Sequence, residues 1–177
     1  MIDLETLDRV SNSAILSIAA VDFDDFENFF YSKINLDSCL EHKLSVSKST
    51  LVWWLNNDLE IFKDQLKGEE SLKDVLNSLS NFIYKKFDQV WCYGASFDFP
   101  ILKNAYNVCN LEIPWKYSQE HDLRTLVNLF SESKGYFKNN HNPVQDSINQ
   151  IEAYKQIYDN FMKFSITKPF MGVKICC

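Results

Sequence analysis

Basic residues are few in this 177-residue chain, which has 18 lysines and arginines against 24 aspartates and glutamates and a net charge of −6. Nonspecific affinity for nucleic acid depends mainly on positive charge. The charge balance therefore argues against an extended DNA-coating role. It does not argue against an active site that meets phosphate groups through bound cations.

Long apolar runs, paired cysteines and targeting segments are also missing from the sequence. No apolar run approaches the roughly 20 residues that span a bilayer, so we expect no contact with a membrane. The five cysteines include no CxxC pair, which favours reduced thiols. No signal or transit peptide opens the chain, and we expect a cytoplasmic protein.

The remaining composition is ordinary for a globular protein, with 46% apolar and 24% charged residues. The length suits a single domain, residues 1–177, whose tail from about residue 163 has no assigned role. Short strands expected at residues 1–5, 13–23 and 27–34 suit an antiparallel meander. Because helices and strands alternate after them, the order predicts an α/β fold with a mixed sheet flanked by helices.

Apolar residues recur at helical spacing in five later segments, at residues 48–57, 72–83, 100–109, 123–130 and 143–162. Residues with capping side chains precede most of them. Ser49 or Thr50 is expected to cap the first helix, Ser71 the second, Asp122 the fourth and Asn142 the last. The stretch SKGYFKNNHNPV at residues 133–144, rich in Gly, Asn and Lys, is the obvious loop.

One aspartate, Asp98, lies at a corner in the sequence WCYGASFDFP, where an apolar strand at residues 90–93 gives way to the helix that Pro100 opens. One interpretation is an N-cap whose carboxylate accepts the free amides of the first helical turn. The other is a carboxylate with a chemical function. The position alone leaves both interpretations open.

Two further acids, Asp3 and Glu5, lie two residues apart in the first strand, so both side chains project from the same face. Burying them unpaired would be costly, and they need a cation unless the strand is an exposed edge.

His141 and Asp146 flank the start of the last helix. Each could be unremarkable, as a loop histidine and an acid that suits the helix dipole.

Together these residues form one pattern: DLE on a first strand, GASFD at a later strand end, and a histidine five residues before an aspartate at the opening of a late helix. The pattern resembles the DEDDh family of 3′–5′ exonucleases, which have the RNase H-like fold. The segments STLVWW, WCYGASFDFPIL and HDLRT are similar to the branch that contains phage exodeoxyribonuclease A and the exonuclease VIII-like proteins. The resemblance implies an RNase H-like mixed sheet of three antiparallel strands followed by parallel strands.

The resemblance also implies a reaction, in which 5′-mononucleotides are released from the 3′ end of DNA, preferably single-stranded. Two Mg²⁺ ions, which Mn²⁺ can replace, would be held by Asp3, Glu5, Asp98 and Asp146, and His141 would be the general base. A phage-encoded protein of this kind would act in the cytoplasm of its host bacterium.

Five residues are candidates for contacts with the substrate. They are Thr6, Leu7, Trp54, Phe99 and Arg124. Adjacent helical residues point about 100° apart, so at most one of Trp53 and Trp54 can face a cleft. Arg124 can either reach a substrate phosphate or pair with Asp122.

Three alternatives to a DNA exonuclease stay open. A noncatalytic RNase H-like module could bind nucleic acid, although the presence of all five motif residues speaks against it. An exoribonuclease or an oligonucleotide scavenger is compatible with the same motifs, because the 2′-hydroxyl distinguishes RNA from DNA and no sequence feature reports on it. A proofreading subunit is the third alternative, and the sequence leaves a monomer and a homodimer undecided.

Overall fold

The computed structural model describes residues 1–84, 86–130 and 141–167, with side chains described as far as residue 162. Within these ranges five strands form one sheet in the order β3-β2-β1-β4-β5. Their bounds are Ile2–Thr6 (β1), Ile15–Val21 (β2), Phe29–Lys33 (β3), Val90–Cys92 (β4) and Glu120–Asp122 (β5). Strands β1, β2 and β3 pair antiparallel, whereas β4 pairs parallel with both β1 and β5.

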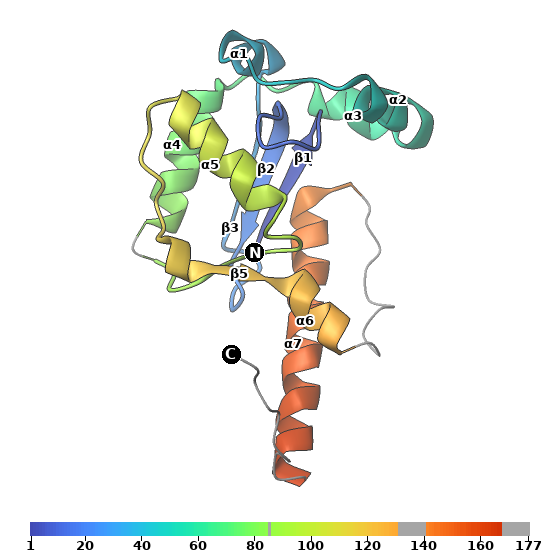
Figure 1. Ribbon diagram of the computed structural model, residues 1–177, viewed down its shortest axis with the longest axis vertical. Coiled ribbons are helices and arrows are strands. Elements are labelled where there is room, and N and C mark those ends of the chain that lie inside the picture. The colour runs from blue at the N-terminus through green and yellow to red at the C-terminus, as the bar shows by residue number, and fades with distance from the viewer. Residues whose placement is uncertain (85, 131–140, 168–177) are drawn as a thin grey trace, which may run out of the picture.

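Seven α-helices of the described residues flank this sheet. They are Leu36–Glu41 (α1), Lys48–Asn57 (α2), Leu59–Gln65 (α3), Leu72–Ile83 (α4), Asp98–Val108 (α5), Leu123–Leu129 (α6) and Pro143–Thr167 (α7). In Figure 1, α4 and α5 lie on one side of β1 and β2, and α7 lies on the other. This is the predicted α/β architecture with a mixed sheet, and it is consistent with an RNase H-like fold.

Strand β1 is the central strand of the sheet, so its acids are not on an exposed edge. Because side chains alternate along a strand, its two faces differ in chemistry. Ile2 and Leu4 belong to the main hydrophobic core, which includes the buried residues of α4 and α5. Asp3 and Glu5 project from the opposite face, the side on which α7 packs. A second core of buried residues from β4, α6 and α7 forms on that side.

Most expected helix starts are confirmed by the hydrogen bonds of their caps. The Ser71 hydroxyl and the Asp122 carboxylate each accept an amide of the first turn, in α4 and α6 respectively. The cap of α2 is different from the expected one. Ser47, and neither Ser49 nor Thr50, caps this helix, because its hydroxyl accepts the amide of Thr50.

Helices α1 and α3 and strand β5 are short and were not predicted from the sequence. Helix α1 has six residues and buries only Cys39, so it offers no apolar stripe to detect. Strand β5 has three polar residues and is defined by its backbone pairing with β4. The last helix extends to Thr167, beyond the expected end at residue 162, and most of the predicted loop lies outside the described residues. No helix in the described ranges is long and apolar enough to cross a membrane.

Candidate active site

Three of the predicted acids converge in space. Asp3 and Glu5 come from β1 and Asp146 from the first turn of α7, and one carboxylate oxygen of each lies within 4.8 Å of the others. Asn142 sets the start of α7, because its side-chain oxygen accepts the Gln145 amide at 3.2 Å and its carbonyl accepts the Asp146 amide at 2.8 Å. This cap places Asp146 against the central strand.

The fourth acid, Asp98, follows the carboxyl end of β4 and is buried. The N-cap interpretation is wrong, because α5 begins at Asp98 itself, the cap position is Phe97, and no side chain makes a capping hydrogen bond there. Burial raises the pKa of Asp98 to about 7, although a hydrogen bond with the Cys92 thiol opposes the shift. Asp98 lies outside the three-acid group, yet after burial its charge is the largest cause of the raised pKa of Asp3.

Burial and mutual repulsion raise the pKa values of the acids on β1. The pKa of Asp3 is well above its ordinary value because of burial first, then the charges of Asp98 and Glu5. Burial also raises the pKa of Glu5. Such a cluster is stabilised by protons or by cations. Clustered carboxylate oxygens are the donors that Mg²⁺ and Mn²⁺ prefer, so the residues present fit a site for divalent cations.

His141 lies beside this cluster. Its Nδ1 is 3.8 Å from Glu5 Oε1 and its Nε2 is 3.4 Å from Asp58 Oδ2. The imidazole ring also packs edge-on against Trp53 and Trp54, with ring centroids 4.9 and 5.6 Å away. The pKa of His141 is raised, mainly by its hydrogen bond with Glu5. The structure therefore brings together all five residues of the sequence motif.

Asp3, Glu5, Asp98 and His141 line a cleft of about 530 Å³, and the buried Asp146 lies behind its wall, beside Asp3 and Glu5. Thr6, one of the predicted substrate contacts, also lines the cleft, and its hydroxyl donates to the Asp8 carbonyl. Trp53 and Trp54 differ in exposure, as expected for adjacent residues that point about 100° apart on a helix. Trp53 is 41% exposed, whereas Trp54, the predicted substrate contact, is 1% exposed and donates from its indole nitrogen to the Thr6 carbonyl. Trp53 is thus the ring that offers a free surface.

Arg124 lines the same cleft, near Asp98. Its guanidinium lies 4.9 Å from the centre of the Tyr93 ring and donates to the Tyr93 carbonyl at 3.0 Å. In the described part of the chain its guanidinium forms no ion pair with Asp122, whose carboxylate instead caps α6 by accepting the backbone amide of Arg124. Of the two alternatives for Arg124, the position facing the cleft agrees with this geometry.

Two of the predicted substrate contacts do not reach the cleft. Leu7 and Phe99 are almost fully buried in the main core, and neither lines the cleft. The backbone amide of Leu7 is also occupied, because it donates to the carbonyl of Ala14. Both apolar side chains gain more from the core than from a wet cleft. Phe97 is the phenylalanine that lines the cleft.

The polar residues of this site that were not predicted from the sequence include Arg9, Asp58 and Gln150. Nothing in the sequence separates Arg9 or Asp58 from other charged residues near a helix or strand end. Gln150 could have been found, because it lies four residues after Asp146 and therefore on the same face of a helix. Its side-chain nitrogen donates to Asp3 Oδ1 at 3.0 Å.

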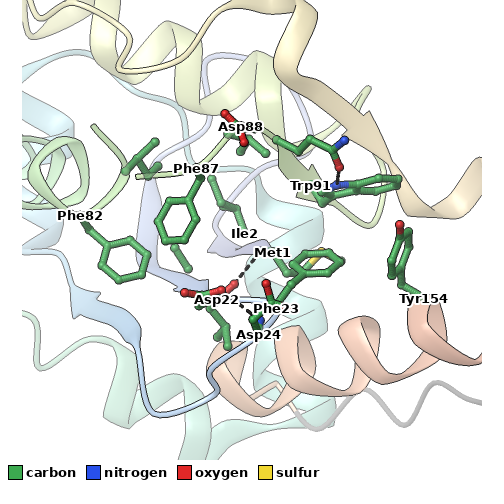
Figure 2. A pocket seen from close by; sticks show the side chains of 15 residues that line it. Met1, Ile2, Asp22, Phe23, Asp24, Phe82, Phe87, Asp88, Trp91 and Tyr154 are labelled. Carbon is green, nitrogen blue, oxygen red and sulfur yellow. Dashed lines mark hydrogen bonds between the residues drawn. The ribbon is translucent and has the colours of Figure 1, made fainter. Parts of the chain in front are cut away.

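A second hollow, of about 390 Å³, lies near the amino ends of β1 and β4 and contains none of the motif residues. In Figure 2, the rings of Phe23, Trp91 and Tyr154 gather along its wall. Asp22 also lines it, but its two oxygens already accept the Asp24 amide and the Asn28 side chain. Asp24 and Asp88 line the hollow as well, but among the described residues the group of acids close enough to share a metal ion is Asp3, Glu5 and Asp146, so the candidate site is the cleft near the carboxyl end of β4.

Comparison with known proteins places the chain in a nuclease family. Residues 1–158 match the profile of the 3′-5′ exoribonuclease Rv2179c-like domain. The chain is also similar to an exodeoxyribonuclease of Enterobacteria phage T4. The two sequences are 29% identical over 161 residues, and the match covers 72% of this chain and 69% of the phage protein.

Proposed function

Because the chain belongs to the 3′-5′ exoribonuclease Rv2179c-like domain family and is a 3′–5′ exonuclease of nucleic acid, we propose that it works by the two-metal mechanism of the DEDDh exonucleases. The proposed ligands are Asp3, Glu5, Asp98 and Asp146, and the proposed general base is His141. The observation that carries the proposal is the approach of three carboxylates within 4.8 Å of one another, with His141 beside Glu5.

The proposed ligands suit an anionic substrate only with cations present. Mg²⁺ or Mn²⁺ ions held there would activate the attacking water and offset the negative charge that develops on the phosphate. The four carboxylates, one from each of Asp3, Glu5, Asp98 and Asp146, carry four negative charges when ionised, and two divalent ions would cancel them. This balance reconciles an acidic protein with a nucleic-acid substrate.

His141 is proposed to accept the proton of the attacking water. A neutral imidazole can do this near neutral pH, since the ordinary pKa of histidine is about 6.5. Glu5 is the main cause of the raised pKa of His141, and a cation on Glu5 would remove much of that effect. The contacts with Asp58 and the two tryptophan rings hold the imidazole close to the acids.

We propose DNA with a free 3′ end as the substrate, single-stranded DNA being preferred, because a phage exodeoxyribonuclease is among the relatives. RNA is the second candidate, since the family profile is described as an exoribonuclease domain. The exposed ring of Trp53 would suit either, because stacking on a base tolerates any sequence. Residues 1–177 are proposed to act as one exonuclease domain.

End-labelled oligonucleotides test the direction and the substrate together. The enzyme is expected to shorten linear strands from the 3′ end and to release nucleotides with 5′-phosphates, while a closed circular strand of the same sequence resists digestion. Matched DNA and RNA strands, single and double, should show the fastest release from single-stranded DNA. Cutting of the circle would indicate an endonuclease, and faster release from RNA would favour the second candidate.

Replacement of Asp98 by asparagine separates a ligand from a structural acid. Asp98→Asn should abolish turnover and leave the midpoint of thermal unfolding unchanged or higher, because a neutral amide costs less to bury than a carboxylate. Asp74→Asn, in the cap of α4, is the matched control and should keep its activity. A variant that unfolds at a much lower temperature but hydrolyses its substrate normally would return Asp98 to a structural role.

A further inference from the structure

Gln150 is a buried polar residue of α7 that the motif does not include. Its side chain is 6% exposed and lies between the helix and the central strand. The side-chain nitrogen donates to Asp3 Oδ1 at 3.0 Å. Of the hydrogen bonds between described residues, this is the one that a side chain donates to the Asp3 carboxylate. It lowers the pKa of Asp3, whereas burial and the neighbouring acids raise it.

The orientation of the Gln150 amide follows from this contact. An amide oxygen turned toward an ionised carboxylate would place two acceptors together, so the nitrogen must face Asp3. The other amide atom, Oε1, is then buried, and no described residue donates a hydrogen bond to it. A buried acceptor without a donor destabilises a fold. The hydrogen bond to Asp3, for which Gln65 has no counterpart, is what distinguishes this buried amide.

The spacing on α7 explains how one helix can serve two acids. Asp146 and Gln150 are four residues apart, so both side chains lie on the helix face that packs against β1 and β2. Asp146 contributes a carboxylate to the three-acid group, and Gln150 contributes a donor to a carboxylate of that group. The helix thus holds the negative charge on Asp3 with a neutral partner, where a basic residue would compete with a bound cation.

We propose that Gln150 is a positioning residue, which rests on the proposed function: its amide nitrogen fixes the rotation of the Asp3 carboxylate so that this group presents its free lone pairs to the metal ions. Carboxylates that bind metals are commonly held in this way, and loss of such a partner costs about 10–100-fold in metal affinity or activity. Gln150 does not touch the reacting atoms and acts through Asp3.

The test uses the full chain and two isosteric substitutions. Gln150→Met keeps the length of the side chain but cannot donate a hydrogen bond. Gln65→Met is the matched control, because Gln65 is also buried, at 3% exposed, and has an Oε1 with no donor among the described residues, but its amide donates to the Tyr31 hydroxyl and it does not line the cleft. For each protein, Mn²⁺ affinity is measured by calorimetry, turnover on single-stranded DNA by kcat and KM, and stability by thermal unfolding in EDTA.

Gln150→Met should bind Mn²⁺ about 10–100-fold more weakly than the wild type, with KM nearly unchanged. Saturating Mn²⁺ should recover part of its turnover, which a misfolded site would not allow. Gln65→Met should match the wild type in metal affinity. The inference is overturned if Gln150→Met binds Mn²⁺ like the wild type, or if both variants lose affinity equally. A wild type that binds no Mn²⁺ would instead refute the proposed function.

Discussion

Chelation of divalent cations is expected to reduce nucleotide release to background. The acids on β1 have raised pKa values because burial and mutual repulsion disfavour their charges, and a cation is the partner that allows them to ionise together near a phosphate. The measurement is release from end-labelled single-stranded DNA after dialysis against EDTA, followed by addition of Mg²⁺, Mn²⁺ or Ca²⁺. Mg²⁺ and Mn²⁺ should restore activity.

The same experiment has a readout that is independent of catalysis. A ligand that binds only the folded protein stabilises it, by about 2.7 kcal/mol when its concentration is 100 times its dissociation constant. Mg²⁺ should therefore raise the midpoint of thermal unfolding of the wild type, and Asp146→Ala should lose this increase. Full activity after thorough chelation would rule out the two-metal mechanism.

Replacement of His141 is expected to have the second large effect. His141→Ala should lower kcat by about 10²–10⁴-fold, the usual cost of losing a general base. Its affinity for Mg²⁺ should stay close to that of the wild type, because four carboxylates supply the proposed ligands. Calorimetric titration with Mg²⁺, beside single-turnover kinetics, separates the two effects.

Two variants serve as controls for His141. His42→Ala removes a half-buried histidine that contacts Cys109, outside the cleft, and should leave kcat unchanged. Asp146→Ala should weaken metal binding as well as turnover. Loss of metal binding in His141→Ala would show that the imidazole is a ligand. Tight DNA binding by a wild type that releases nothing with either metal would favour a noncatalytic binding module.

The features that the sequence determined by itself are local. Alternation along a strand put Asp3 and Glu5 on one face, and capping chemistry placed the starts of α4, α6 and α7 at Ser71, Asp122 and Asn142. Such features depend on contacts between residues a few positions apart, so the chain specifies them without its distant parts. The mixed sheet followed from the order of these elements.

Tertiary packing decided which side chains reach the cleft. The sequence allowed at most one of Trp53 and Trp54 to offer its ring to a cleft. Both line the cleft, but Trp54 is buried by packing and donates to the Thr6 carbonyl, 48 residues away in the chain, so Trp53 is the exposed ring. Leu7 and Phe99 lie in the core and not in the cleft for the same reason. Packing against elements distant in the sequence buries their apolar side chains, and the local sequence pattern does not report this packing.

Packing also decided the environment of the acids. Asp98 could be an N-cap or a buried acid on its sequence alone, and the start of α5 at that residue, beside the Cys92 thiol, excluded the cap. The pairing of Gln150 with Asp3 joins residues 147 positions apart. Local spacing has no access to such contacts, because they exist only once α7 has packed on the central strand.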